Sequence, residues 1–153
     1  MNNIKKTKLY TILFHSLIII GAGHGIGIMG IFDVIGIIQI PEIYKNGIIF
    51  NINGDYQDRL SLVVIFSIIG KIILITSLFL NKNLIKNLIT LIGIIILWIS
   101  VYFLTSGNWY YDWLYGFSFL TSIPFLIYSI KLIRLIIENI KQNKKLNINV
   151  NEK

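Results

Sequence analysis

The feature that most constrains this chain is a series of long apolar segments that carry almost no charge. The first runs from Leu9 to Ile40 and contains Asp33 as its one acidic or basic residue, and three further segments of this kind follow it. An apolar segment of about 20 residues is long enough to cross a bilayer as a helix. We therefore predict an all-α membrane protein, a bundle of four transmembrane helices within a single domain (1–153). The expected spans are about 9–31, 60–80, 88–105 and 114–137.

The composition supports contact with lipid. The chain is 55% hydrophobic and only 14% charged, whereas soluble domains carry about 25% charged residues. It contains no cysteine, which excludes disulfides, thiol nucleophiles and cysteine-ligated metal sites. The expected partner is the lipid bilayer.

The basic residues predict the orientation of the helices. Eleven of the 14 lysines and arginines fall on one side of the predicted spans, two on the other, and Lys71 within a span. Basic residues concentrate on the cytoplasmic side, so both termini and the tail (138–153) are expected there, with the loop 41–59 outside. This distribution explains the net charge of +7 without nucleic-acid binding, and we expect the bacterial cytoplasmic membrane. The eleven are Lys5, Lys6, Lys8, Lys82, Lys86, Lys131, Arg134, Lys141, Lys144, Lys145 and Lys153.

The first apolar segment is too long for one upright span. As a continuous helix it would reach roughly 48 Å, against a hydrocarbon core of about 30 Å. The helix must therefore tilt, break or extend beyond the membrane, and its glycines mark where a break would fall. The pairs Gly21/Gly25 and Gly23/Gly27 have the spacing of close helix packing. The alternative is an unwound segment that lines a site.

Lys71 is the most unusual residue of the second span, because it lies near the middle of the bilayer. A charge there costs about 2.5–3.5 kcal/mol and is a candidate functional group. The alternative is that its side chain extends to the headgroups. Ser67 lies on the same side of the helix and indicates that this side faces inward.

Two further ionisable residues of the first segment are candidates for a ligand or ion pathway. His24 is a candidate proton relay, ligand or interhelical contact. His15 lies nine positions earlier, so the two histidines do not form one metal site on a straight helix. Asp33 is expected near the outer boundary, where it either pairs with Arg59 or Lys45 or is exposed to water. An inward bend at the glycines would instead bring it to Lys71.

The last span carries hydroxyl groups along one helix face. Tyr115, Ser118, Ser122 and Ser129 follow each other at spacings of three, four and seven residues, which places them on one side. Such a face either lines a cavity or forms hydrogen bonds to neighbouring helices.

No motif in the sequence indicates catalysis. The chain lacks a Walker loop, a nucleophile elbow and an HExxH motif. Four helices with a glycine-rich first helix resemble, in general layout, the small DoxX-type membrane proteins; the resemblance assigns no residue and no activity.

Three functions remain open. The first is an accessory or structural subunit that packs within a larger membrane complex or a homo-oligomer. The second is a transporter or channel-like protein for a small solute, ion or proton, using Lys71, His24 and Asp33. The third is a redox protein that binds haem or quinone near His24. The sequence identifies no cofactor, so that question stays open.

Overall fold

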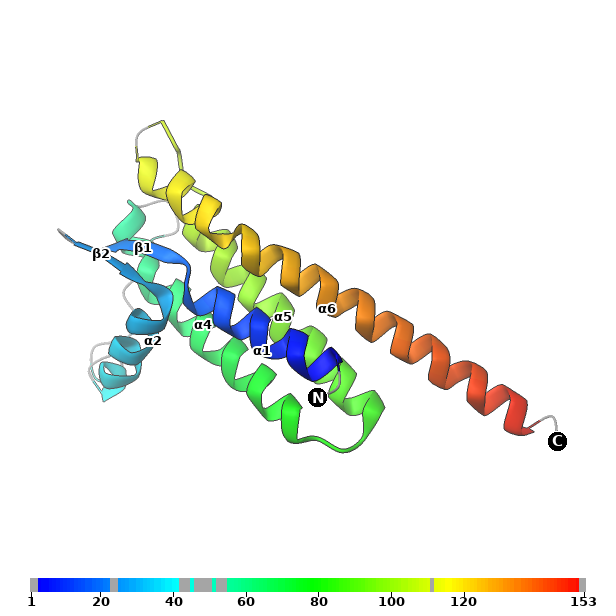
Figure 1. Cartoon of the computed structure of the whole chain (residues 1–153). Coiled ribbons are helices and arrows are strands. Elements are labelled where there is room, and N and C mark those ends of the chain that lie inside the picture. The colour runs from blue at the N-terminus through cyan, green and yellow to red at the C-terminus, as the bar shows by residue number, and fades with distance from the viewer. Residues whose placement is uncertain are drawn as a thin grey trace.

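The computed structural model is predominantly helical. It describes residues 3–22, 25–41, 45, 51, 55–110 and 112–151, without the side chains of Ala22 and of residues beyond 142. Seven elements follow one another along the chain (Figure 1). They are α1 (Asn3–Ser16), β1 (Ile19–Ala22), β2 (Gly25–Ile28), α2 (Met29–Ile38), α4 (Tyr56–Phe79), α5 (Asn83–Thr105) and α6 (Trp113–Asn151).

Among the described residues, three helices are long and apolar enough to cross a membrane: α4, α5 and the part of α6 from Trp113 to Gln142. They correspond to the second, third and fourth predicted spans. The main difference is that α6 continues as a helix to Asn151, well beyond the predicted end of its span. A shorter apolar helix, α2, accompanies these three.

The structure buries many polar side chains and exposes many apolar ones, unlike a soluble protein. Polar groups such as Thr11, Ser67, Thr90 and Ser122 are completely buried, while many large aliphatic side chains lie on the surface. Surface residues of a soluble domain are mostly polar, and lipid is the solvent in which exposed isoleucine and leucine are favourable. The side chains thus agree with helix length and composition in pointing to a membrane protein.

The first apolar segment does not form one helix. It forms α1, an antiparallel pair of short strands and α2, so the prediction of a continuous first span is wrong and the break at the glycines is confirmed. Both strands are rich in isoleucine and glycine, which alternate in β2: isoleucine favours strands and glycine is a poor helix former. Ile20 pairs with Gly27, and Gly21 with Ile26. Gly21, Gly25 and Gly27 therefore lie in strands and not on the faces of a helix.

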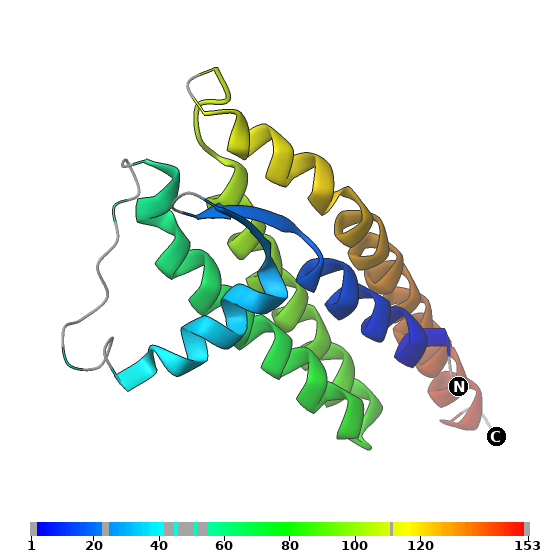
Figure 2. The same cartoon turned by 60° about the vertical axis from the view of Figure 1, so that its left-hand side comes forward.

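The helix α1 lies between α4 and α6, and the strand pair follows it (Figure 2). The α6 hydroxyls bind the backbone of β1: Thr121 Oγ1 accepts from the Ile19 amide at 3.1 Å, and Ser118 Oγ donates to the Ile19 carbonyl at 2.9 Å. Non-helical backbone at membrane depth requires such partners. The hydroxyl face of α6 is therefore part of what allows the chain to leave the helical conformation.

Close contact between α4 and α5 depends on two glycines. A methyl group at Gly70 would lie 2.6 Å from a methyl carbon of Leu97 and 3.2 Å from the carbonyl of Gly93. Small residues allow membrane helices to approach each other in this way. The helix α2 packs against α4, whereas α1 packs mainly against α6.

Candidate functional site

The centre of the candidate site is an ion pair between Asp33 of α2 and Lys71 of α4. The Lys71 ammonium contacts Oδ2 of Asp33, and each of these side chains is only 10% exposed. Ser67, one turn before Lys71, donates a hydrogen bond to Oδ1 of Asp33 at 2.5 Å. Both carboxylate oxygens therefore have partners.

The break in the first apolar segment is what brings Asp33 to this position. The two strands reverse the chain, and the Met29 amide donates to the Ile18 carbonyl at 2.8 Å where α2 begins. Gly36, one turn after Asp33, packs directly on Val64 of α4. The inward bend considered for Asp33 is thus present, and Lys71 pairs with this carboxylate instead of extending to the headgroups.

The other cation expected near Asp33 lies elsewhere. Arg59, in the first turn of α4, donates to Ser106 at 3.1 Å and lies over the ring of Tyr115. The pairing of Asp33 with Arg59 is therefore not the one that the fold adopts.

In this environment each of the two charges depends on the other for its stability. A single charge near the middle of a bilayer costs a few kcal/mol, and a buried pair offsets that cost only when its geometry is good and its remaining hydrogen bonds are made. Lys71 and Ser67 supply both conditions. Chemically, the arrangement can hold α2 against α4, and it can exchange a proton.

A second buried contact, which the sequence did not indicate, lies near the connection between α4 and α5. Lys8 is fully buried, and its ammonium donates to the hydroxyl of Ser77 at 2.9 Å. Burial, with Lys86 and Lys5 nearby, lowers the pKa of Lys8 from 10.5 to about 8. The available signal was the spacing of the polar residues in α1, since Thr7, Lys8, Thr11 and His15 are its buried residues.

At the opposite end of the fold, the hydroxyls of α6 form a third polar group. Tyr56 lies 2.8 Å from Ser118 Oγ, and its own hydroxyl is the donor because Ser118 donates to Ile19. Tyr115 packs edge-on against Tyr56. Ser122 donates to the Phe119 carbonyl one turn before it, and the predicted hydroxyl face, Ser129 included, is buried as a whole.

The remaining predicted residues have different outcomes. His24 and Gly23 lie outside the described residues. His15, which was considered only as a partner of His24, is completely buried in the core. Where the structure describes the chain, no group of three histidine, cysteine, aspartate or glutamate side chains comes together as a metal site would require.

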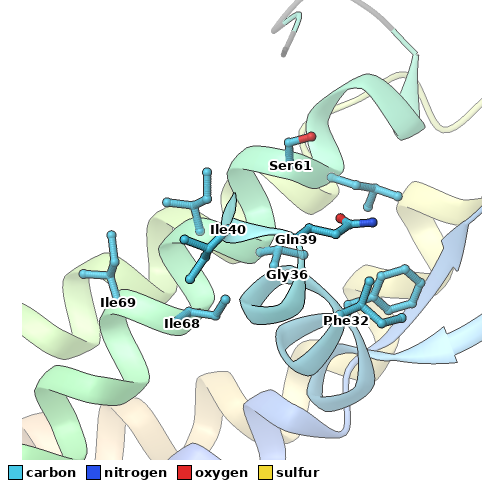
Figure 3. Close-up of a pocket in the computed structure, with 11 residues that line it drawn as sticks. Phe32, Gly36, Gln39, Ile40, Ser61, Ile68 and Ile69 are labelled. Atoms are coloured by element: carbon cyan, nitrogen blue, oxygen red, sulfur yellow. The ribbon is translucent and has the colours of Figure 1, made fainter. Parts of the chain in front are cut away.

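An apolar groove lies beside the ion pair, between α2 and α4. It has a volume of about 410 Å³, and its walls include Phe32, Ile40, Ile68 and Ile69 (Figure 3). Gln39 and Ser61 are its polar side chains. Neither Asp33 nor Lys71 is among the residues that line it.

Taken together, the fold and the buried ion pair define a small helical membrane protein. No protein-family model matches the chain, and neither the curated proteins nor the solved structures contain a match to it. The function therefore has to be argued from the site itself.

Proposed function

We propose that this chain is a transporter or channel-like membrane protein, and that the Asp33–Lys71 pair is the charged site of its pathway for a small ion, solute or proton. Its bundle would consist of the three spanning helices, with the broken segment α1–β1–β2–α2 as the fourth component. Both termini lie in the cytoplasm in this proposal, because the basic residues gather on that side. In the described part of that set, Lys5 and Lys86 both act electrostatically on Lys8.

The observation that carries this proposal is a buried ion pair between a broken membrane segment and an intact helix. Ionisable groups inside a membrane protein mark substrate and ion pathways, and broken segments form the central sites of many transporters. Here the broken segment supplies the carboxylate and an intact helix supplies the cation.

The polar groups in the interior also suggest the course of the pathway. Lys8 with Ser77 lies towards the end where α4 joins α5, and Tyr56 with Ser118 lies at the opposite end. The ion pair lies between these two groups along α4, because residue 71 falls between residues 56 and 77. Polar side chains are thus available on both sides of the charged site.

The experiment that tests this proposal uses the absence of native cysteine. In Ser67→Cys and Ser122→Cys, single thiols are placed at buried interior positions, and a charged, membrane-impermeant thiol reagent is applied to the protein in lipid vesicles. A pathway predicts labelling of both thiols, since the reagent reaches them through water.

Two control variants make the result interpretable. Ile72→Cys, on the lipid-facing side of α4, is expected to resist the reagent, and Asn81→Cys, in the exposed connection after α4, to react rapidly. Interior thiols that are as unreactive as the Ile72→Cys control would refute a water-filled pathway, which a solute or a hydrated ion requires.

A second candidate function, an accessory subunit, rests on the groove between α2 and α4. With ten residues, α2 is too short to cross the bilayer, and its outer side presents Ile31, Val34 and Ile38. A helix of a partner protein would find an apolar surface there. This function predicts unreactive interior thiols together with a stoichiometric membrane partner after purification in mild detergent.

The haem or quinone hypothesis stays a prediction, since His24 lies outside the described residues. An absorption spectrum of the purified protein tests it for haem, and extraction with organic solvent tests it for quinone.

A further inference from the structure

His15 is a buried ionisable group to which the proposed function assigns no role. It lies in the last turn of α1 and has no exposed surface. Its ring packs edge-on against Phe125 of α6, with the ring centres 4.8 Å apart. Neither ring nitrogen has a hydrogen-bond partner within the described part of the chain. Buried polar atoms are nearly always paired, so such an exception calls for an explanation.

The groups around His15 come from α4, α5 and α6, besides α1 itself. The backbone carbonyl of Leu97 in α5 lies near the ring but outside hydrogen-bonding geometry. From α4, Lys71 is the one charged group among the described residues that acts on the imidazole electrostatically. Asp33 of α2 is bound to that same lysine. On α1 itself, Thr11 and Lys8 share the buried face with His15.

This arrangement places two bases near one carboxylate in an apolar interior. Asp33 can neutralise one positive charge, and a second positive charge would be unpaired and costly. With Lys71 protonated, His15 is therefore neutral, as an imidazole packed against Phe125 would be. If His15 gains a proton, repulsion favours loss of the proton from Lys71, and the total charge of the three groups returns to zero.

We infer that His15 and Lys71 are alternative proton carriers of the interior site, so that the ion conducted through the protein is a proton. This inference rests on the proposed function and specifies its substrate. In each cycle a proton from water forms an N–H bond on the imidazole, and an N–H bond of Lys71 breaks to release a proton on the other side. When a side-chain movement brings the two groups into contact, the imidazolium transfers its proton to the neutral amine of Lys71, which restores the starting state without an oxidant or a co-substrate.

The first test measures the protonation of His15 by ¹⁵N solid-state NMR of the protein in lipid. The chain has two histidines, and His24→Gln identifies the signal of His15. In Lys71→Met, Asp33 is left without its cation, so the midpoint for protonation of His15 should rise by at least about one pH unit relative to wild type. In Asp33→Asn, the midpoint should fall.

A purely structural histidine would not show these opposite shifts. A His15 signal that stays neutral down to pH 4 in the wild-type protein would overturn the inference, and this result needs no variant to fold. A midpoint that Lys71→Met leaves unchanged would overturn it as well.

The second test measures proton entry into vesicles that contain the protein and a trapped pH-sensitive dye, driven by a potassium gradient with valinomycin. Wild-type protein should acidify the lumen faster than empty vesicles do. His15→Gln should reduce the rate at least tenfold, while Ile72→Val, on the lipid-facing side, should leave it unchanged. Equal rates for wild-type and empty vesicles, or for wild type and His15→Gln, would overturn the inference.

The tests also separate the two proposals. If Ser67→Cys and Ser122→Cys react with the charged reagent while His15 does not titrate, the pathway stands and the proton is not its substrate. If the interior thiols are unreactive and the vesicles do not acidify, both proposals fail.

Discussion

The Asp33–Lys71 pair leads to a quantitative prediction for a double-mutant cycle. In Asp33→Asn the carboxylate is replaced by an amide that can still accept the hydrogen bond from Ser67, and in Lys71→Met the cation is replaced by an apolar chain of similar length. Each single substitution leaves one charge without its partner at a site where both side chains are 10% exposed. Loss of one member of a buried pair costs about 3–5 kcal/mol.

The double variant should be much more stable than the sum of these losses predicts. With both charges removed, no unpaired charge remains in the membrane, and replacing a buried ion pair by neutral groups is often close to neutral. We therefore expect a total loss of only about 1 kcal/mol, within the small range typical of volume-conserving changes. The coupling energy would then be about 5–9 kcal/mol, above the range of about 0.5–3 kcal/mol that contacting residues usually show.

The assay is reversible unfolding of the purified protein in mixed micelles as the mole fraction of sodium dodecyl sulfate increases. It is followed by the fluorescence of the three tryptophans. The cycle consists of wild type, the two single variants and the double variant, all at one pH. If the two single losses simply add in the double variant, the charges do not interact, and the ion pair does not fasten α2 to α4.

Two further predictions follow from other contacts. In Gly36→Val, added methyl groups would meet Val64 of α4 and should destabilise the docking of α2 by about 1–3 kcal/mol, detected as faster proteolysis after α2; Gly116→Ala, where an added methyl meets only Trp109 at 3.5 Å, is the control, and equal proteolysis of both would contradict the packing. For Lys8, the pKa of about 8 in the folded state lies below the ordinary lysine value of 10.5, so the unfolded chain holds the proton more tightly. The free energy of unfolding should therefore rise between about pH 8 and pH 10. Lys8→Met should abolish that rise, and an unchanged pH profile would show that Lys8 is not the responsible group.

The sequence predicted the spanning helices well because their signal is local. An uninterrupted apolar segment such as that of α5 contains its own evidence, and its observed end at Thr105 is the predicted one. Lys71 and Asp33 also stood out without a structure, since a charge in an apolar segment is conspicuous wherever the segment lies.

The conformation of the first segment was harder to predict because two tendencies compete within it. Its hydropathy is that of a transmembrane helix, while the alternation of glycine and isoleucine in Gly25–Ile28 is that of a strand. The outcome depends on partners more than 90 positions later in the chain, since Thr121 and Ser118 bind the backbone of Ile19. Lys8 was interpreted as part of a basic flank, because its contact with Ser77, 69 positions later, is also distant in sequence.

The break in the first segment also has a consequence for biosynthesis. Neither α1, with 14 residues, nor α2, with ten, is long enough to cross the bilayer. The translocon therefore meets the carboxylate of Asp33 before Lys71, its counter-charge, has been synthesised 38 positions later. We therefore expect α2 to dock only after α4 has been synthesised, so that the carboxylate is buried together with its counter-charge.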